Sequence, residues 1–256
     1  MLSAVRSGLA GLVDLALPSS CAGCATDGPV LCIGCASGLE GRAHLTRPDP
    51  APDGLPPTWA VAAYAGAVRA AVVAHKEEGR RALSRPLGAA LARSVTATRD
   101  VVGQGSGGGL SELLLVPAPS RAAAVRARGG DPTLALARSA AAHLQQEGLD
   151  VRVVRALQVR RGLLDQAGLG AADRAANLSG ALAVSRSAAG QLAGRRVVVV
   201  DDVLTTGATL AEVARALRTA GAEVGAAAVV AATRRTRRAA RGGGSPGGVS
   251  PGVAGD

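Results

Sequence analysis

The segment from residue 195 to residue 210, RRVVVVDDVLTTGATL, constrains the fold more than any other part of the chain. Four consecutive valines are typical of a β-strand whose two faces are both buried. Two aspartates, Asp201 and Asp202, follow directly, and TTGAT then leads into an amphipathic segment. A strand buried on both faces requires helices on either side of a mainly parallel sheet. The segment therefore predicts an α/β fold with polar groups where this strand ends.

The rest of the chain alternates apolar runs with helical patterns, as such a fold requires. We expect strands at residues 59–66, 113–120, 151–158, 197–200 and 223–233. We expect helices at residues 2–13, 67–79, 80–97, 131–148 and 209–222. Asp131 and Pro132 are typical of a helix start, and Gly221 is typical of a helix end. The sequence thus predicts a mainly parallel sheet flanked by helices.

The composition says what the core is made of and where the positive charge lies. The chain has 256 residues, 48% of them hydrophobic, but only one Trp, one Tyr and no Phe, so the core must consist of Ala, Val and Leu. The formal net charge is +10, and part of it is the arginine cluster RRTRRAAR at residues 234–241. This cluster is either a solvated tail or a basic arm that contacts nucleic acid or an acidic partner. No aromatic residues interleave with the arginines, which weakens a base-stacking interpretation.

The sequence contains no signal peptide pattern and no uninterrupted apolar run long enough to span a membrane. The apolar N-terminal run is broken by Asp14, and PSSC before Cys21 lacks the leucine of a lipoprotein signal. We therefore expect a cytoplasmic protein without a membrane partner.

All four cysteines of the chain lie in two C-x2-C pairs separated by seven residues: Cys21, Cys24, Cys32 and Cys35. Two such pairs can place four thiolates around one tetrahedral metal ion. The alternatives are two disulfides or four free thiols, and disulfides are rare in a cytoplasmic protein. The spacing therefore predicts a structural zinc site, which has no open coordination position and so no catalytic role.

The residues after the valine run predict a ligand site. Ligands of such sheets bind at the carboxyl ends of the strands, and a helix N-terminus after TTGAT favours a phosphate. Two carboxylates next to that phosphate suit sugar hydroxyls or a divalent cation carried by the ligand. The combination predicts a sugar with a 5′-phosphate, whereas simple helix capping is the alternative. The GxxxxGK[ST] phosphate loop and a GxGxxG fingerprint are both missing at this turn.

The pattern VVVVDDVLTTGAT resembles the phosphoribosyl diphosphate motif of type I phosphoribosyltransferases. Other segments resemble the ComF family of competence-associated, phosphoribosyltransferase-like proteins: the two C-x2-C pairs, YAGAVRAAVVAHKEEG, LLLVPAPSRAAAVRARGGDP and VRRGLLDQAGLGAADRAANLSGAL. The resemblance covers roughly residues 12–232. Gly130 and Asp131 stand where the family pattern has Phe and Asn, and the last segment contains Gln166, Arg174 and Asn177.

The resemblance implies roles for individual residues. Asp201 and Asp202 would bind the ribose hydroxyls and, with water, Mg²⁺. The 5′-phosphate would be bound by Thr205, Thr206, Gly207, Ala208 and Thr209. The diphosphate would be bound by a loop of Ala118, Pro119, Ser120 and Arg121, with Lys76, Arg126 and Arg128 as further candidate contacts. For each arginine alone, a solvated surface charge is the alternative. Some purine-type members carry an acid where this chain has Thr205, so the acceptor base stays unnamed.

Two functions follow from the resemblance. The first is a Mg²⁺-dependent phosphoribosyltransferase that acts on phosphoribosyl diphosphate and an unknown base. The second is a non-catalytic module that senses this ligand or binds a partner during DNA uptake, beside a helicase-like competence protein and single-stranded DNA. The expected organisation is an N-terminal helix and zinc ribbon (1–40), a linker (41–58), a phosphoribosyltransferase-like domain (59–232) and a basic, disordered tail (233–256).

Overall fold

The computed structural model describes residues 20–102, 112–120, 125, 129–159 and 180–233. The expected helix at 2–13, the loop at 103–111 and almost all of the tail lie outside these residues.

The described helices are α2 (Ile33–Ala36), η1 (Ser37–Leu39), α3 (Gly66–Lys76), η2 (Arg81–Leu83), α4 (Ser84–Ala97), α5 (Arg99–Val102), α7 (Pro132–Gln146), α9 (Arg186–Leu192) and α10 (Ala208–Thr219). The described strands are β1 (His44–Thr46), β2 (Thr58–Ala63), β3 (Leu113–Pro117), β4 (Val151–Val153), β5 (Leu157–Val159), β6 (Leu182–Val184), β7 (Arg196–Leu204) and β8 (Glu223–Ala232).

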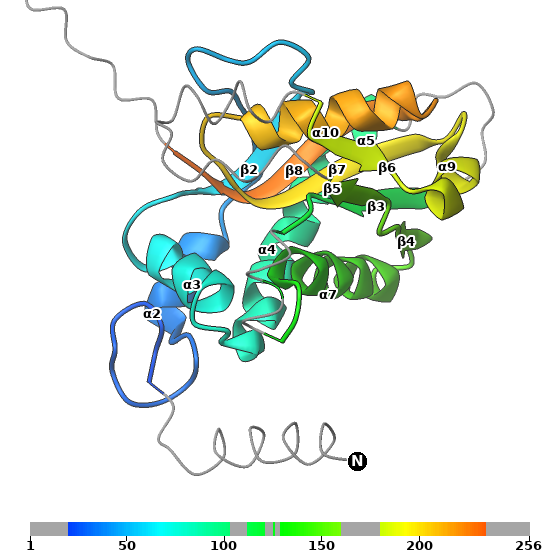
Figure 1. Ribbon diagram of the computed structural model, residues 1–256. Helices are drawn as coiled ribbons and strands as arrows, with labels where there is room; N and C mark the ends of the chain where they lie inside the picture. Colours follow the sequence, from blue (N-terminus) through cyan, green and yellow to red (C-terminus); the bar gives the residue numbers. More distant parts are fainter. Residues whose placement is uncertain (1–19, 103–111, 121–124, 126–128, 160–179, 234–256) are drawn as a thin grey trace, which may run out of the picture.

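A six-stranded sheet in the order β1-β2-β8-β7-β3-β4 forms the centre of the molecule (Figure 1). All neighbouring strands are parallel except β1, which pairs with β2 in the antiparallel direction. The strands β5 and β6 form a separate antiparallel pair. The α/β fold with a mainly parallel sheet flanked by helices, predicted from the valine run, is confirmed.

Helices cover both faces of the sheet, as the valine run required. The helices α3, α4 and α7 lie on one face, and α10 lies on the other with α9 and the β5–β6 pair (Figure 1). The valines of β7 alternate between the two cores: Val198 and Val200 pack in the first, and Val197 and Val199 in the second. Each is fully buried, which stabilises the fold by roughly 1.5–3 kcal/mol per side chain.

Small residues let the helices approach one another closely, which compensates for the lack of aromatic side chains. A Cβ atom on Gly88 of α4 would lie 2.3 Å from the hydroxyl of Ser139 on α7, so only glycine fits there. Ser94 of α4 is also fully buried and donates a hydrogen bond of 2.8 Å to the carbonyl of Val229 on β8. The core is thus close-packed with Ala, Val and Leu.

The structure corrects two expected boundaries. Strand β7 does not end at Val200: it continues to Leu204 and includes both aspartates, because its pairing with β8 continues through Asp201 and Val203. The expected strand at 151–158 is two short strands, β4 in the central sheet and β5 in the separate pair. Backbone pairing is indifferent to side-chain polarity, so the end of an apolar run does not mark the end of a strand.

The expected linker, residues 41–58, contains strand β1, which pairs with β2 through Thr46 and Thr58. The division into four parts at 1–40, 41–58, 59–232 and 233–256 remains a prediction. Among the residues that the structure describes, none of the helices is long and apolar enough to cross a membrane.

Candidate functional site

The two aspartates lie in the last part of β7, next to the end of α3. The side chain of Asp202 is buried and that of Asp201 is half-buried. Lys76, the last residue of α3, places its ammonium nitrogen 2.7 Å from a carboxylate oxygen of Asp202. The fold therefore brings Lys76 next to two predicted site residues that are distant from it in sequence.

The surroundings of these charges alter their proton affinities. Burial, and then the nearby negative charge of Asp202, raises the pKa of Asp201 to about 8. Burial alone would lower the pKa of Lys76, but the charges of Asp202 and Asp201 outweigh it and raise that pKa. The backbone N–H of Asp202 donates a hydrogen bond of 2.9 Å to the Asp201 carboxylate. The site is an acidic pair with one cation beside it, and such perturbed groups are typical of functional sites.

The TTGAT sequence forms a turn that opens into α10. Thr205 and Thr206 are exposed, and Gly207 begins the helix with a left-handed φ of 79°. No side chain caps this helix start, and its first turn contains no acidic residue. The N–H group of Ala208 makes only a long contact of 3.4 Å with the Thr206 hydroxyl. An uncapped helix start with exposed hydroxyls can bind a phosphate, and that this turn does so stays a prediction.

The segment after β3 lies beside β7. The N–H group of Ala118 donates to the carbonyl of Val200 at 2.9 Å, so the predicted diphosphate loop starts next to Asp201. The hydroxyl of Ser120 donates to the Asp131 carboxylate at 2.8 Å. Asp131 also caps α7, as predicted, by accepting from the N–H group of Leu134. Hence Asp131, which departs from the family pattern, fixes this loop onto α7.

Three predicted ligand contacts, Arg121, Arg126 and Arg128, lie outside the described residues, as do Gln166, Arg174 and Asn177 of the segment that resembles the family. Their positions stay predictions. One residue that the sequence did not indicate, Arg81 of η2, donates a hydrogen bond of 2.7 Å to the carbonyl of Gly129 and so supports the end of the same loop. Its position in an arginine-rich segment gave no signal of this role.

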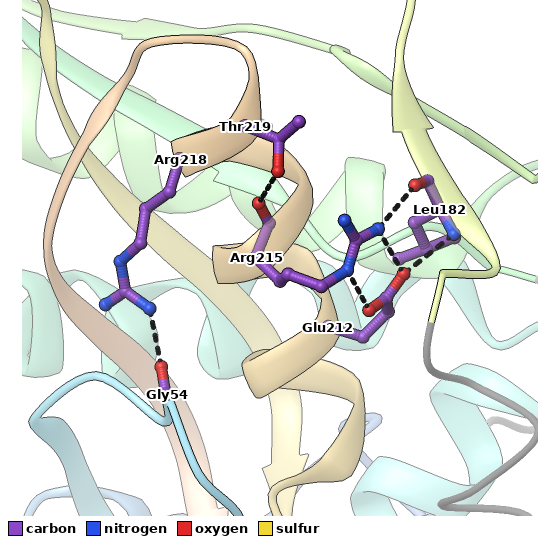
Figure 2. Close-up of polar contacts among 6 residues, drawn as sticks. All are labelled: Gly54, Leu182, Glu212, Arg215, Arg218 and Thr219. Atoms are coloured by element: carbon purple, nitrogen blue, oxygen red, sulfur yellow. Dashed lines mark hydrogen bonds and ion pairs between the residues drawn. The ribbon is translucent and has the colours of Figure 1, made fainter.

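An ion pair on α10 between the buried Glu212 and the partly exposed Arg215 fixes the β5–β6 pair against the helix (Figure 2). Both guanidinium contacts of Arg215 to the Glu212 carboxylate are short, at 2.6 and 2.8 Å. Glu212 also accepts from the N–H group of Leu182, and Arg215 donates to the carbonyl of the same residue. Burial would raise the pKa of Glu212, but the hydrogen bonds from Arg215 and Leu182 lower it. The i,i+3 spacing of acid and base was the signal in the sequence.

The four cysteines form a second site, away from the sheet. Their sulfur atoms all lie within 4.8 Å of one another, and none is in a disulfide. The Sγ atoms of Cys24 and Cys32 are 3.8 Å apart, close to the ~3.8 Å between two ligands of a tetrahedral zinc ion with bonds of about 2.3 Å. The N–H groups of Cys32 and Gly23 both point at Cys21 Sγ, at 3.3 Å each. This arrangement fits a zinc ion and excludes the predicted alternative of two disulfides in this structure.

Local contacts shape the cysteine site. The pKa of the Cys21 thiol is lowered to about 6, mainly because the backbone N–H group of Cys32 donates to its sulfur. The pKa of the Cys35 thiol is raised to about 12, mainly by the hydrogen bond with the Cys32 side chain. A Cβ atom on Gly23 would lie 2.6 Å from Cys35 Sγ, so glycine is required between the first two cysteines. Two arginines donate hydrogen bonds to the ribbon, Arg80 to the carbonyl of Ser20 and Arg93 to that of Leu39, and Val30 and Leu31 pack against the core.

Comparisons with known proteins show which proteins parts of this chain resemble. The family model described as phosphoribosyl transferase domain matches residues 134–242, less than half of the chain. Adenine phosphoribosyltransferase from Mycobacteroides abscessus is 67% identical over 39 residues, 15% of this chain and 22% of that protein. The Mycobacterium avium enzyme of the same name is 67% identical over 38 residues, 15% of this chain and 21% of that protein. Competence protein F of Haemophilus influenzae is 50% identical over 60 residues, 23% of this chain and 25% of that protein.

The matched part is thus about a quarter or less of the length of these curated relatives. The domain match, the similarity to Competence protein F and the four-cysteine cluster occur in one chain. Together they confirm the resemblance stated from the sequence.

Proposed function

We propose that this chain, which is ComF-like and carries a phosphoribosyltransferase domain with an N-terminal cysteine ribbon, binds phosphoribosyl diphosphate at the ends of β3 and β7. One observation carries the proposal: an acidic pair, of which Asp202 is buried and lies 2.7 Å from the Lys76 ammonium, precedes an uncapped helix N-terminus. This arrangement offers acceptors for sugar hydroxyls, donors for a phosphate and a cation for a diphosphate within a short stretch of backbone.

Each part of the site has a separate task in this proposal. The turn from Thr205 to Thr209 binds the 5′-phosphate through N–H groups and hydroxyls. Asp201 and Asp202 accept hydrogen bonds from the ribose hydroxyls. The loop that starts at Ala118 holds the diphosphate, and Lys76 contributes its positive charge there. Carboxylate and diphosphate oxygens suit Mg²⁺, which when bound would neutralise part of the diphosphate charge.

We further propose that the phosphoribosyl group is transferred to a base. Such a transfer passes through a state with positive charge on the sugar, as in glycoside hydrolysis. The task of the chain is then to hold the ribose and to stabilise the departing diphosphate with cations. The Thr205 hydroxyl is a poor general base, so this residue does not assist deprotonation of the acceptor, and the acceptor stays unnamed.

The presence of threonine instead of an acid at position 205 also supports a second candidate function, a module that binds the ligand without turnover. The similarity to Competence protein F supports a role in DNA uptake for either candidate, with a helicase-like protein and single-stranded DNA as proposed partners. Release of diphosphate from phosphoribosyl diphosphate in the presence of a base separates the two: a transferase releases it and a sensor does not.

A double substitution tests the binding site itself. Asp201→Asn with Asp202→Asn should abolish Mg²⁺-dependent binding of phosphoribosyl diphosphate in calorimetry, because the ribose loses its acceptors. The change removes the repulsion between the two carboxylates as well as the ion pair of Asp202 with Lys76, and because these two effects oppose each other we expect the variant to stay folded. Thr206→Val should weaken binding of ribose 5-phosphate even without Mg²⁺.

Glu223→Gln is the matched control, because Glu223 is an exposed carboxylate at the opposite end of the sheet, where it pairs with Arg196. This variant should bind as the wild type does. If the double variant unfolds, the aspartates support the fold instead. If it folds and binds the sugar phosphate normally, the ligand site lies elsewhere.

A further inference from the structure

Residues 47–57, which the sequence indicated as part of a linker, form a loop whose ends are fixed on the sheet. Thr46 and Thr58 are paired across β1 and β2 at the two ends of the loop. The carbonyl of Pro57 accepts from the N–H group of Ala227 on β8 at 2.8 Å, and that of Pro56 accepts from the hydroxyl of Thr58 at 2.8 Å. We call this loop the proline strap, after its five prolines: Pro48, Pro50, Pro52, Pro56 and Pro57. Because proline fixes φ, the strap has little conformational freedom.

The strap lies against the start of α10. A Cβ atom on Gly207 would lie 3.1 Å from a methyl carbon of Leu55 and 3.3 Å from Cγ of Pro48, so both side chains occupy the space beside the Gly207 backbone. Leu55 also packs against the core on that face of the sheet. Figure 1 shows the blue loop that precedes β2 beside α10. The contact explains why Gly207 is buried while its neighbour Thr206 is exposed.

A hydrogen bond near the other end of α10 holds the strap in place. Arg218, in the last turn, donates from Nη1 to the carbonyl of Gly54 at 2.7 Å (Figure 2). Gly54, which directly precedes Leu55, has a φ of 74°, a left-handed conformation that favours glycine. The strap is therefore attached to both ends of the helix whose start forms the phosphate turn.

We propose that the proline strap is a positioning element for the phosphate turn. Leu55 and Pro48 keep the backbone of Gly207 in its left-handed conformation, so that the following N–H groups point at the ligand. Arg218 keeps Leu55 in contact. The proposal rests on the proposed function, in which the turn binds a sugar 5′-phosphate. Without the strap, the ligand would have to order the turn on binding. The entropy cost of ordering about one residue corresponds to about a tenfold loss of affinity, so we expect binding to be weaker by about that factor.

The test is calorimetric binding of ribose 5-phosphate to Leu55→Ala and Arg218→Ala, each expected to bind about tenfold more weakly. Leu55→Met and Arg218→Lys should restore most of the affinity, because methionine fills the same contact and lysine still reaches the Gly54 carbonyl. Arg152→Ala is the control: Arg152 is a similarly exposed arginine whose ion pair with Glu112 lies near the start of β3, away from the turn. It should bind as the wild type does.

Hydrogen exchange without ligand gives a second, independent readout. The amides of residues 207–210 should exchange faster in both alanine variants, whereas those of β8 should not change. If affinity and exchange stay at wild-type values, or if exchange also rises throughout β7 and β8, the positioning role is wrong. If the wild type binds no ribose 5-phosphate, the proposed function fails, and the exchange rates at residues 207–210 still decide whether the strap orders the turn.

Discussion

Asp201 is a residue whose surroundings oppose its charge. Its carboxylate is half-buried on a strand, and Asp202 is its neighbour, so its pKa rises from an ordinary 3.8 to about 8. The folded protein therefore holds this proton more tightly than the unfolded chain does. By linkage, the stabilisation is complete at low pH and is lost as the pH rises from about 4 to about 8. A ligand whose hydroxyls donate to the carboxylate would offset this cost.

Asp201→Asn should therefore stabilise the ligand-free protein more at high pH than at low pH. One pKa unit corresponds to about 1.4 kcal/mol, and a carboxylate that is only partly buried keeps part of its hydration, so we expect a gain of about 1–2 kcal/mol at pH 9 and almost none at pH 4. Urea unfolding at several pH values without divalent metal measures this difference. Glu223→Gln should show no comparable trend, and an equal gain from Asp201→Asn at every pH would contradict the prediction.

At the scale of elements, the sequence predicted the strands and helices that local patterns encode. The valines of β7 and the cap at Asp131 are local signals, and both elements are where they were expected. The extension of β7 through Asp201 was missed because it depends on pairing with β8, which no local pattern encodes. The contact between Lys76 and Asp202 joins residues far apart in the chain, and only the resemblance had placed both near one ligand.

The proline strap was missed for a different reason. Residues rich in Pro, Gly and Asp are typical of linkers, and the sequence gives no partner for them. The density of prolines was nevertheless a signal, because five in 11 residues make a loop stiff. What the sequence could not supply was the contact of Leu55 with Gly207 and the bond from Arg218 to Gly54.

The cysteine ribbon gives a prediction at this scale. The purified chain should contain about one zinc ion, since four sulfur atoms cluster at tetrahedral spacing. Cys24→Ser should lose most of this zinc in metal analysis and should loosen the ribbon, because the thiolate is a ligand that a hydroxyl does not replace. Binding of ribose 5-phosphate should be unaffected, as the ribbon lies away from β7.

Ser37→Ala is the matched control within the ribbon. Its hydroxyl donates to the carbonyl of Gly34, at 2.8 Å, and contributes no sulfur to the cluster, so zinc content should stay at the wild-type level. Purified wild-type protein with no stoichiometric zinc, or with two native disulfides, would show that the four thiols serve another purpose.

At the scale of the whole molecule, the positive charge is unevenly distributed. Acidic and basic side chains are nearly balanced among the described residues, so most of the net charge of +10 lies in the other ranges. These include the segment with Arg121 of the proposed diphosphate loop and the candidate contacts Arg126 and Arg128, and the cluster at 234–241. The basic character of the chain is therefore a property of two segments, one at the proposed ligand site and one at the C-terminal end of this sequence.

Removal of residues 234–256 separates these two contributions. If the chain binds single-stranded DNA, the truncated chain should bind more weakly and with a flatter dependence on salt, because each arginine that contacts a phosphate releases counterions. The cluster contains five arginines, so we expect the slope of log affinity against log salt to fall by at most about 3.5. Fluorescence anisotropy at several salt concentrations measures both quantities.

Binding of ribose 5-phosphate to the same truncated chain is the control and should not change, because Thr206 and Gly207 stay in place. An unchanged affinity and salt slope for DNA would mean that the cluster is a solvated tail, and that any contact with DNA is made by other residues.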